Sequence, residues 1–281
     1  MDVGATSLAP VGTLPVSGYA MAFSPSCDQL AVGHSADGSN RASAYALDGS
    51  PHEIAALGPF PLPVGAIALS SDGRVAVGTN DGAVHLFDAS GGPVAESAPT
   101  AGHDSVMCLL FAGDRVVVGH YHGRVRTLAV DGEALRPVES TQAATGAERE
   151  RGSLDLDTGD VVMPGGRRVW ALAATPRGVL ALEESGTVRR LGGGASSAVV
   201  EGLSLPSVMA LAPDGGHLLV AGGPAAVFAL GEHGARFERA PIGFDSVEGF
   251  TAARDVFFLD DRRFAIVGFV TMRLFVYELP G

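Results

Sequence analysis

The chain has 281 residues, a formal net charge of -12 and a sequence pI of about 5.0. An acidic protein repels phosphate backbones, so nucleic acid is excluded as an expected partner. Two cysteines, Cys27 and Cys108, are too few for a disulfide framework, and no stretch approaches the roughly 20 apolar residues that span a bilayer.

The sequence starts without a basic and apolar leader, so we expect a cytoplasmic protein with no membrane partner. Apart from histidine, every basic residue is an arginine, which we interpret as codon bias in a GC-rich bacterial genome. Selection for planar, multidentate arginine contacts at interfaces is the alternative explanation.

A three-strand unit recurs along the chain. The first strand of each copy begins near Tyr19, Val64, Val106, Val169, Val208 and Arg254. The second strands are nearly continuous apolar runs, at 30–33, 75–78, 116–119, 179–182, 218–222 and 264–268. The third strands lie at 42–47, 84–88, 125–130, 188–191, 226–230 and 274–279. We expect the second strands to be covered on both faces and the third strands to be half exposed.

These repeats predict an all-β protein: a β-propeller of six blades, each of four antiparallel strands, forming a single domain over residues 1–281. The chain ends directly after a third strand. We therefore expect Ser7 to Pro15 to form the outer strand of the last blade and to close the ring, because an outer edge strand tolerates proline.

One interval between repeats is too long. The 63 residues that separate Val106 from Val169 exceed a normal repeat by roughly 20. We interpret residues 139–168 as a loop insertion between the third and fourth repeats, because the centre of the segment is polar and aperiodic. A seventh, degenerate blade that uses Leu154 to Val162 is the alternative.

Two short motifs add to the repeat pattern. Gly102-His103 stands before the strand at Val106, and Phe87-Asp88 ends the strand that begins at Val84. With the turns Ser71-Asp72-Gly73 and Asp81-Gly82, these positions resemble the WD40 family of β-propellers. The resemblance implies a rigid platform whose rim loops bind other proteins, and a His103 that bonds a neighbouring backbone group.

The densest group of polar side chains is in the third repeat. The resemblance to the WD40 topology implies that the loop at His103 lies on the same rim as the turn that contains His120, Tyr121 and His122. Histidines placed in this way could bind Zn²⁺, but the favoured interpretation is structural, because no acidic or cysteine cluster completes a coordination shell. The whole predicted partner-binding rim comprises His103, Asp104, His120, Tyr121, His122, Arg167, Arg168, Trp170, Glu184 and Phe269.

The sequence contains no phosphate-binding glycine loop, no Gly-x-Ser-x-Gly elbow, no His-Glu-x-x-His and no Cys-x-x-Cys motif. We therefore predict a non-enzymatic protein-interaction scaffold, a subunit of a bacterial multiprotein assembly, with no catalytic residue, metal or cofactor. The alternative is a small-molecule or metal-dependent hydrolase, similar to a lactonase, with its site at the axial funnel. A carbohydrate-binding protein is a third class, which the scarcity of aromatic residues in the repeated loops disfavours.

Overall fold

The structure is a computed structural model. It describes residues 20–26, 28–47, 51–100, 102, 104–138, 160–162, 168–175, 178–191, 197–201, 203, 206–222, 225–230, 237–242, 253–268 and 274–279. Within these ranges the chain forms strands and no helix, which confirms the all-β class. The chain divides into two compact units, one within residues 10–169 and the other mainly within residues 170–281.

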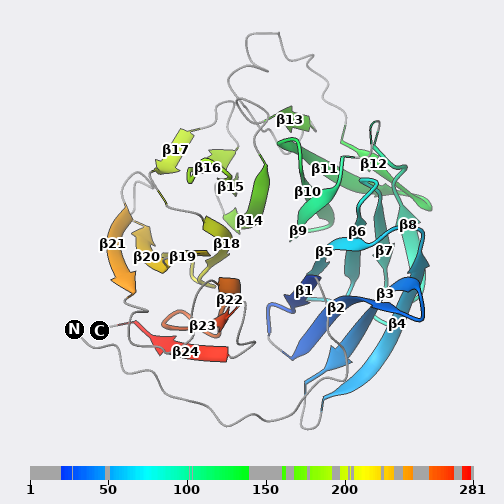
Figure 1. The fold of residues 1–281 in the computed structure, drawn as a ribbon, viewed down its shortest axis with the longest axis horizontal. Helices are drawn as coiled ribbons and strands as arrows, with labels where there is room; N and C mark the ends of the chain where they lie inside the picture. The colour runs from blue at the N-terminus through cyan, green and yellow to red at the C-terminus, as the bar shows by residue number, and fades with distance from the viewer. Residues whose placement is uncertain are drawn as a thin grey trace. The chain divides into compact units, whose positions relative to one another are not determined.

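The first unit contains two sheets (Figure 1). One is an antiparallel meander of β1 (Ala20–Phe23), β2 (Gln29–Ala36), β3 (Ser39–Ala46) and β4 (His52–Phe60). The other has nine strands in the order β5-β6-β7-β8-β12-β11-β10-β9, with β13 paired to β11. The bounds of these strands are β5 (Val64–Leu69), β6 (Val75–Thr79), β7 (Val84–Phe87), β8 (Pro93–Glu96), β9 (Val106–Ala112), β10 (Arg115–His120), β11 (Arg124–Asp131), β12 (Ala134–Pro137) and β13 (Asp160–Val162).

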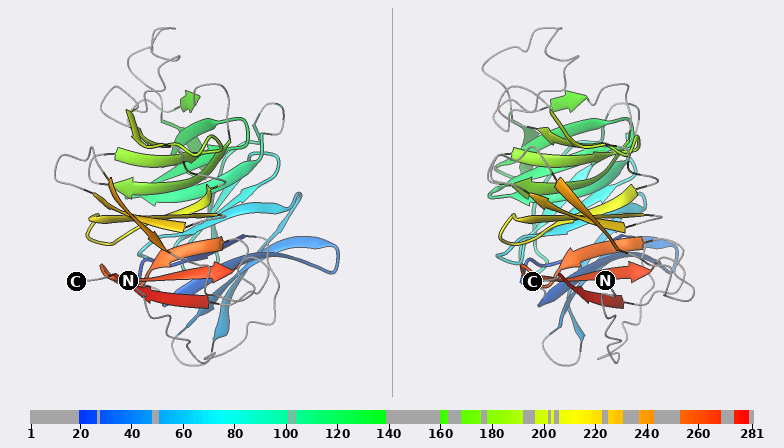
Figure 2. Two further views of the ribbon diagram at one scale, coloured as in Figure 1. Left: turned by 60° about the vertical axis from the view of Figure 1, so that its left-hand side comes forward. Right: turned by 90° about the vertical axis from the view of Figure 1, so that its left-hand side faces the viewer.

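The second unit contains three antiparallel sheets, seen from two sides in Figure 2. The first consists of β14 (Val169–Thr175), β15 (Gly178–Glu183), β16 (Val188–Leu191) and β17 (Ser197–Val200). The second consists of β18 (Pro206–Leu211), β19 (His217–Gly222), β20 (Ala225–Leu230) and β21 (Phe237–Ile242). The last has three strands, β22 (Ala253–Phe258), β23 (Arg263–Gly268) and β24 (Leu274–Glu278).

The predicted fold of six separate four-stranded blades in a closed ring is wrong. The described strands form five sheets of four, nine, four, four and three strands. Two repeats are fused because their edge strands, β8 and β12, pair in parallel through Ala134 and Glu96, which gives each exposed edge a partner. The two strands lie side by side in Figure 1. The predicted closing strand, Ser7 to Pro15, lies outside the described residues.

The alternative of a seventh blade is also wrong. Of the segment proposed for it, the structure describes Asp160 to Val162, which form β13. This strand pairs antiparallel with the start of β11, with Val162 opposite Arg124, and so extends the nine-stranded sheet. The rest of the predicted 139–168 insertion lies outside the described residues, apart from Arg168.

The second strand of each meander is deeply buried, as the apolar runs predict. All five residues of β6 are buried, and so are Val116 to His120 in β10. One core cluster packs the β1–β4 sheet against β5 and β6, and another lies between the β5–β8 and β9–β12 halves of the large sheet. Within the first unit, apolar side chains therefore hold each meander against the next one along the chain.

Glycines within the second strands allow this close approach. A Cβ atom at Gly33 would lie 2.7 Å from Cγ1 of Val64, and one at Gly78 would lie 2.7 Å from Cβ of Val106. In each case the contacted valine opens the next first strand, β5 or β9. The valine packs where a side chain on the glycine would otherwise stand.

Candidate functional site

One turn, between the second and third strands, recurs with the same geometry. It covers Thr79 to Gly82, His120 to Gly123, and Glu183 to Gly186. In each copy the glycine N–H donates to the carbonyl of the first residue, at 3.0, 3.1 and 3.0 Å respectively. The three glycines have φ angles of 84°, 79° and 79°, which explains the glycine at this position. The first residue of each turn is polar and buried.

The three turns satisfy this buried side chain in different ways. Thr79 Oγ1 donates to Asp81 Oδ1 at 2.6 Å, and Glu183 Oε2 accepts from Ser185 Oγ at 2.9 Å. Each of these pairs is formed inside its own turn. The His120 turn instead bonds to Asp104, in the loop before β9. All three turns are tied to a neighbouring loop, since Thr100 N donates to the Asp81 carbonyl at 3.0 Å and Leu203 N donates to the Gly186 carbonyl at 3.1 Å. In the third repeat the buried side chain itself, that of His120, makes this bond.

Asp104 holds the turn through both its backbone and its carboxylate. His120 Nδ1 lies 2.8 Å from the Asp104 carbonyl oxygen, so this nitrogen carries the proton and donates. Asp104 Oδ1 accepts from the His122 backbone N–H at 2.9 Å and lies 3.0 Å from His122 Nδ1. Asp104 N donates to Thr100 Oγ1 at 2.8 Å. The loop before β9 and the β10–β11 turn thus lie together at Asp104, whereas His103 lies outside the described residues.

His120 is fully buried, and burial is the main cause that lowers the pKa of its imidazole. The contacts with Asp104 oppose this shift, while the charges of Arg126 and Arg124 add to it. With Nδ1 protonated, Nε2 carries a lone pair, and among the described residues it has no hydrogen-bond partner. His120 is therefore a neutral structural histidine at neutral pH.

This burial predicts an acid-sensitive fold. A folded-state pKa below the unfolded value of about 6.5 means that protonation favours unfolding, so stability is present above that pH and is lost as the pH falls below it. The amide nitrogen of His120→Asn replaces Nδ1. In acid, we expect this variant to reduce the slope of the free energy of unfolding against pH by up to about 1.4 kcal/mol per pH unit. Urea unfolding at a series of pH values measures the slope. An unchanged slope in the variant would contradict the assignment of the acid sensitivity to His120. Burial also lowers the pKa of His85, which accounts for any pH dependence that remains in the variant.

Tyr121 is half-buried and lies at the centre of the more exposed part of the site. Its backbone N–H donates to the Ser105 carbonyl at 2.9 Å, and its ring meets the His122 ring edge-on at 5.1 Å and 78°. The guanidinium carbon of Arg168 lies 4.0 Å from the centre of the Tyr121 ring, and Arg168 Nη2 contacts the Tyr121 hydroxyl. His122 remains 70% exposed. A guanidinium, a phenol and an imidazole therefore form one ordered group, here called the Tyr121 cluster (Tyr121, His122 and Arg168).

The structure brings together half of the predicted rim. Asp104, His120, Tyr121, His122 and Arg168 are neighbours in the first unit. In the second unit, Trp170 packs partly buried against a core cluster and Glu184 is exposed in the turn after β15. The remaining predicted rim residues lie outside the described residues; they are His103, Arg167 and Phe269.

Metal binding and thiol chemistry find little support in this part of the chain. Among the described residues, no group of three or more His, Cys, Asp or Glu side chains is placed to hold a metal ion. Burial raises the pKa of the Cys108 thiol to about 12, so the thiol stays protonated at neutral pH. Its Sγ donates weakly to the Val169 carbonyl at 3.6 Å, which is a packing role.

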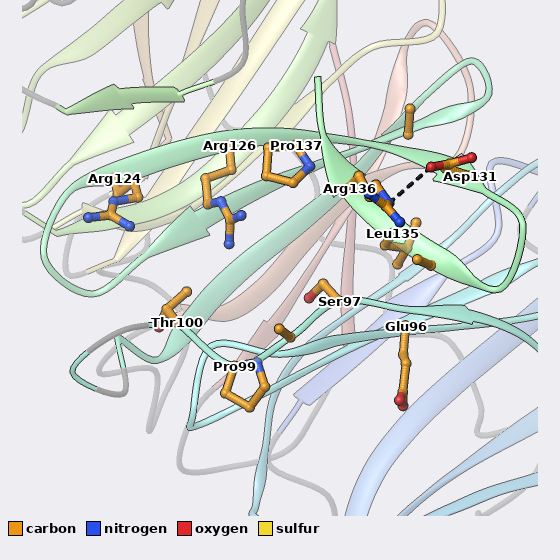
Figure 3. Close-up of a pocket in the computed structure, with 13 residues that line it drawn as sticks. Glu96, Ser97, Pro99, Thr100, Arg124, Arg126, Asp131, Leu135, Arg136 and Pro137 are labelled. Carbon is orange, nitrogen blue, oxygen red and sulfur yellow. Dashed lines mark ion pairs between the residues drawn. The ribbon is translucent and has the colours of Figure 1, made fainter. Parts of the chain in front are cut away.

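A cavity of about 840 Å³ opens where β8 and β12 separate, and the sequence patterns do not predict it. Glu96 N donates to the Glu133 carbonyl at 3.1 Å, but the N–H of the next residue, Ser97, donates to the Val84 carbonyl of β7, on the other side of β8, at 2.8 Å. Beyond this point the two strands diverge, and Arg124 and Arg126 of β11 extend over Thr100 and Pro99 (Figure 3). The only sequence signal for this site is the alternation Arg124-Val125-Arg126 in a strand.

No protein-family model matches the chain, and no curated protein is significantly similar to it. Among solved structures, the crystal structure of the computationally designed Ika8 protein is similar, with a TM-score of 0.59 and 16% sequence identity. The similarity covers 93% of this chain and 70% of the Ika8 chain. At this identity it concerns the fold alone. In the part of the chain that the structure describes, there is no helix of the length and apolar character needed to cross a membrane.

Proposed function

We propose that this chain is a cytoplasmic, non-enzymatic scaffold that binds another protein through the Tyr121 cluster, as a subunit of a bacterial multiprotein assembly. The observation that carries the proposal is the stack of Arg168 on Tyr121, at 4.0 Å, on a turn fixed by the buried Asp104. Tyrosine and arginine are enriched at the energetic centres of protein interfaces.

The anchoring of the cluster favours binding. Ordering a flexible side chain on association costs about 0.5–1.5 kcal/mol. Here the Tyr121 backbone is bonded to Ser105, the His122 backbone is bonded to Asp104, and the Arg168 side chain already lies on the ring. Much of this ordering is therefore complete before the partner arrives, and the exposed parts of the cluster are held in a defined orientation.

Affinity capture with matched variants tests this function. The tagged chain is used to capture partners from extracts of the source organism, and the bound proteins are quantified. We expect Tyr121→Ala to reduce retention of the specific partner about tenfold or more, because a central aromatic contributes about 2 kcal/mol at an interface. Tyr121→Phe keeps the ring and should retain most of the binding.

The control is a cation–π pair at the other end of the strands, where Arg74 lies over Phe111 at 5.5 Å. Arg74→Ala removes an arginine from an aromatic face in the same unit and should leave capture unchanged. A partner that binds wild type, Tyr121→Ala and Arg168→Ala equally well would show that the contact lies elsewhere.

A further inference from the structure

The cavity between β8 and β12 carries a concentration of positive charge in an acidic protein. Three arginines line it, Arg124, Arg126 and Arg136, against two carboxylates, Glu96 and Asp131. A guanidinium remains charged at any physiological pH. The lining is therefore net positive, although the whole chain has a net charge of -12.

Both carboxylates of the lining are engaged at its outer edge. Asp131 Oδ2 pairs with Arg136 Nε at 2.9 Å, and both side chains are largely exposed (Figure 3). Glu96 lies 3.4 Å from His85 Nδ1 and is also largely exposed. Among the residues that the structure describes, no carboxylate is within ion-pair distance of Arg124. The carboxylates at the mouth of the cavity therefore do not neutralise the charge of Arg124.

The spacing on β11 concentrates this charge. Arg124 and Arg126 are two residues apart in one strand, so they share a face, with backbones about 6.6 Å apart. Their field reaches the buried His120, whose pKa burial lowers in the first place and whose protonated form the two arginines disfavour further. An anion bound beside Arg124 is therefore attracted by a charge that no carboxylate of the described residues neutralises.

The other walls can bind the rest of a small organic molecule. The Ser97 hydroxyl accepts the Val84 N–H at 2.9 Å, and among the described residues no acceptor meets its hydrogen, which is left to donate. The remaining lining is mostly apolar and comprises Ala98, Pro99, Ala129, Ala134, Leu135 and Pro137. The volume of about 840 Å³ is within the range of small-molecule sites.

We propose that this cavity is a binding site for a small organic phosphate, with the phosphate on Arg124 and Arg126 and the apolar body along Pro99, Leu135 and Pro137. Planar guanidinium groups recognise phosphate through paired N–H donors. The site is separate from the Tyr121 cluster, so its ligand is a second partner of the chain and not a substitute for the protein partner.

Titration calorimetry with phenyl phosphate and with inorganic phosphate tests the site. Wild-type protein should bind phenyl phosphate saturably and more tightly than inorganic phosphate, because only the first also covers the apolar wall. Arg124→Gln should weaken phenyl phosphate binding about tenfold or more, as expected for one lost charge-assisted contact. Arg124→Lys keeps the charge, loses the paired geometry, and should have an intermediate affinity.

The matched control is Arg136→Gln, which removes the same charge from the same lining at its exposed edge. It should change the affinity by less than about twofold, as expected for an exposed, screened charge. Equal weakening by Arg124→Gln and Arg136→Gln would overturn the proposal in favour of general charge attraction. The absence of saturable binding to wild type, or equal affinity for the two phosphates, would overturn it as well.

Discussion

Gly82→Ala is expected to lower the free energy of unfolding by about 3 kcal/mol. The φ angle of Gly82 is 84°, a conformation that costs a residue with a Cβ atom about 1 kcal/mol. The new methyl group would also clash with Thr100 Oγ1 and lie 2.7 Å from the Asp104 carbonyl oxygen, which adds about 2 kcal/mol of overpacking. Chemical denaturation monitored by circular dichroism measures the loss.

The displaced atoms belong to the anchor of the candidate site. Thr100 Oγ1 accepts the Asp104 N–H, and the Asp104 carbonyl accepts from His120. We therefore expect Gly82→Ala also to weaken partner capture, although Gly82 itself is buried and touches no partner. Gly113→Ala is the control, because Gly113 has a φ angle of 64° and no atom within 4 Å of a new Cβ. It should cost about 1 kcal/mol. Equal losses in the two variants would refute the steric argument.

Phe264→Ala is expected to destabilise the second unit by about 4 kcal/mol. Phe264 is 2% exposed in β23, its ring stacks on Tyr277 at 5.3 Å and 15°, and it lies 5.8 Å from the Phe258 ring. Truncation removes the aromatic contacts and leaves a cavity that strands on both sides keep open. Thermal and chemical unfolding give the loss, and near-ultraviolet circular dichroism reports on the remaining rings.

Two variants separate the cavity from a general loss of apolar surface. Phe264→Leu keeps most of the volume and should cost less than about 1.5 kcal/mol. Leu259→Ala truncates a side chain that is 37% exposed at the end of the same hairpin, so it should cost about 1 kcal/mol. If Phe264→Ala were no more destabilising than Leu259→Ala, the ring would not be a core element of this sheet.

Local sequence predicted the strands and the turns of this protein well. The run Val75 to Gly78 is β6 within one residue, and Val116 to Gly119 lies inside β10. These strands could be predicted because a strand buried on both faces needs apolar side chains at successive positions. The turn from His120 to Gly123 could also be predicted, since Gly123 adopts the positive φ angle that the tight turn requires.

The pairing of the edge strands β8 and β12 could not be predicted from the sequence. Pro93 to Glu96 and Ala134 to Pro137 are short and mixed in polarity, and nothing in either segment indicates that they meet through a single parallel pair. The prediction assumed that each repeat closes on itself and that two chain ends complete the last sheet. Whether an outer strand pairs with the edge of another sheet depends on which edges the packed cores bring together, because the backbone N–H and C=O groups that pair are the same in every residue except proline.

The sequence by itself determined an all-β chain of repeated meanders, their buried second strands, and the polar turn around His120 to His122. These features follow from side-chain periodicity and glycine dihedral angles, which act over a few residues. Tertiary structure decided the fusion of two repeats into a nine-stranded sheet, the anchoring of His120 and His122 by Asp104, and the cavity in which Arg124 and Arg126 extend over Thr100 and Pro99 (Figure 3). Each of these three features joins residues that are distant in the chain, through backbone or charged groups. The pairing of such groups depends on their position in space, so it leaves no periodic pattern in the sequence.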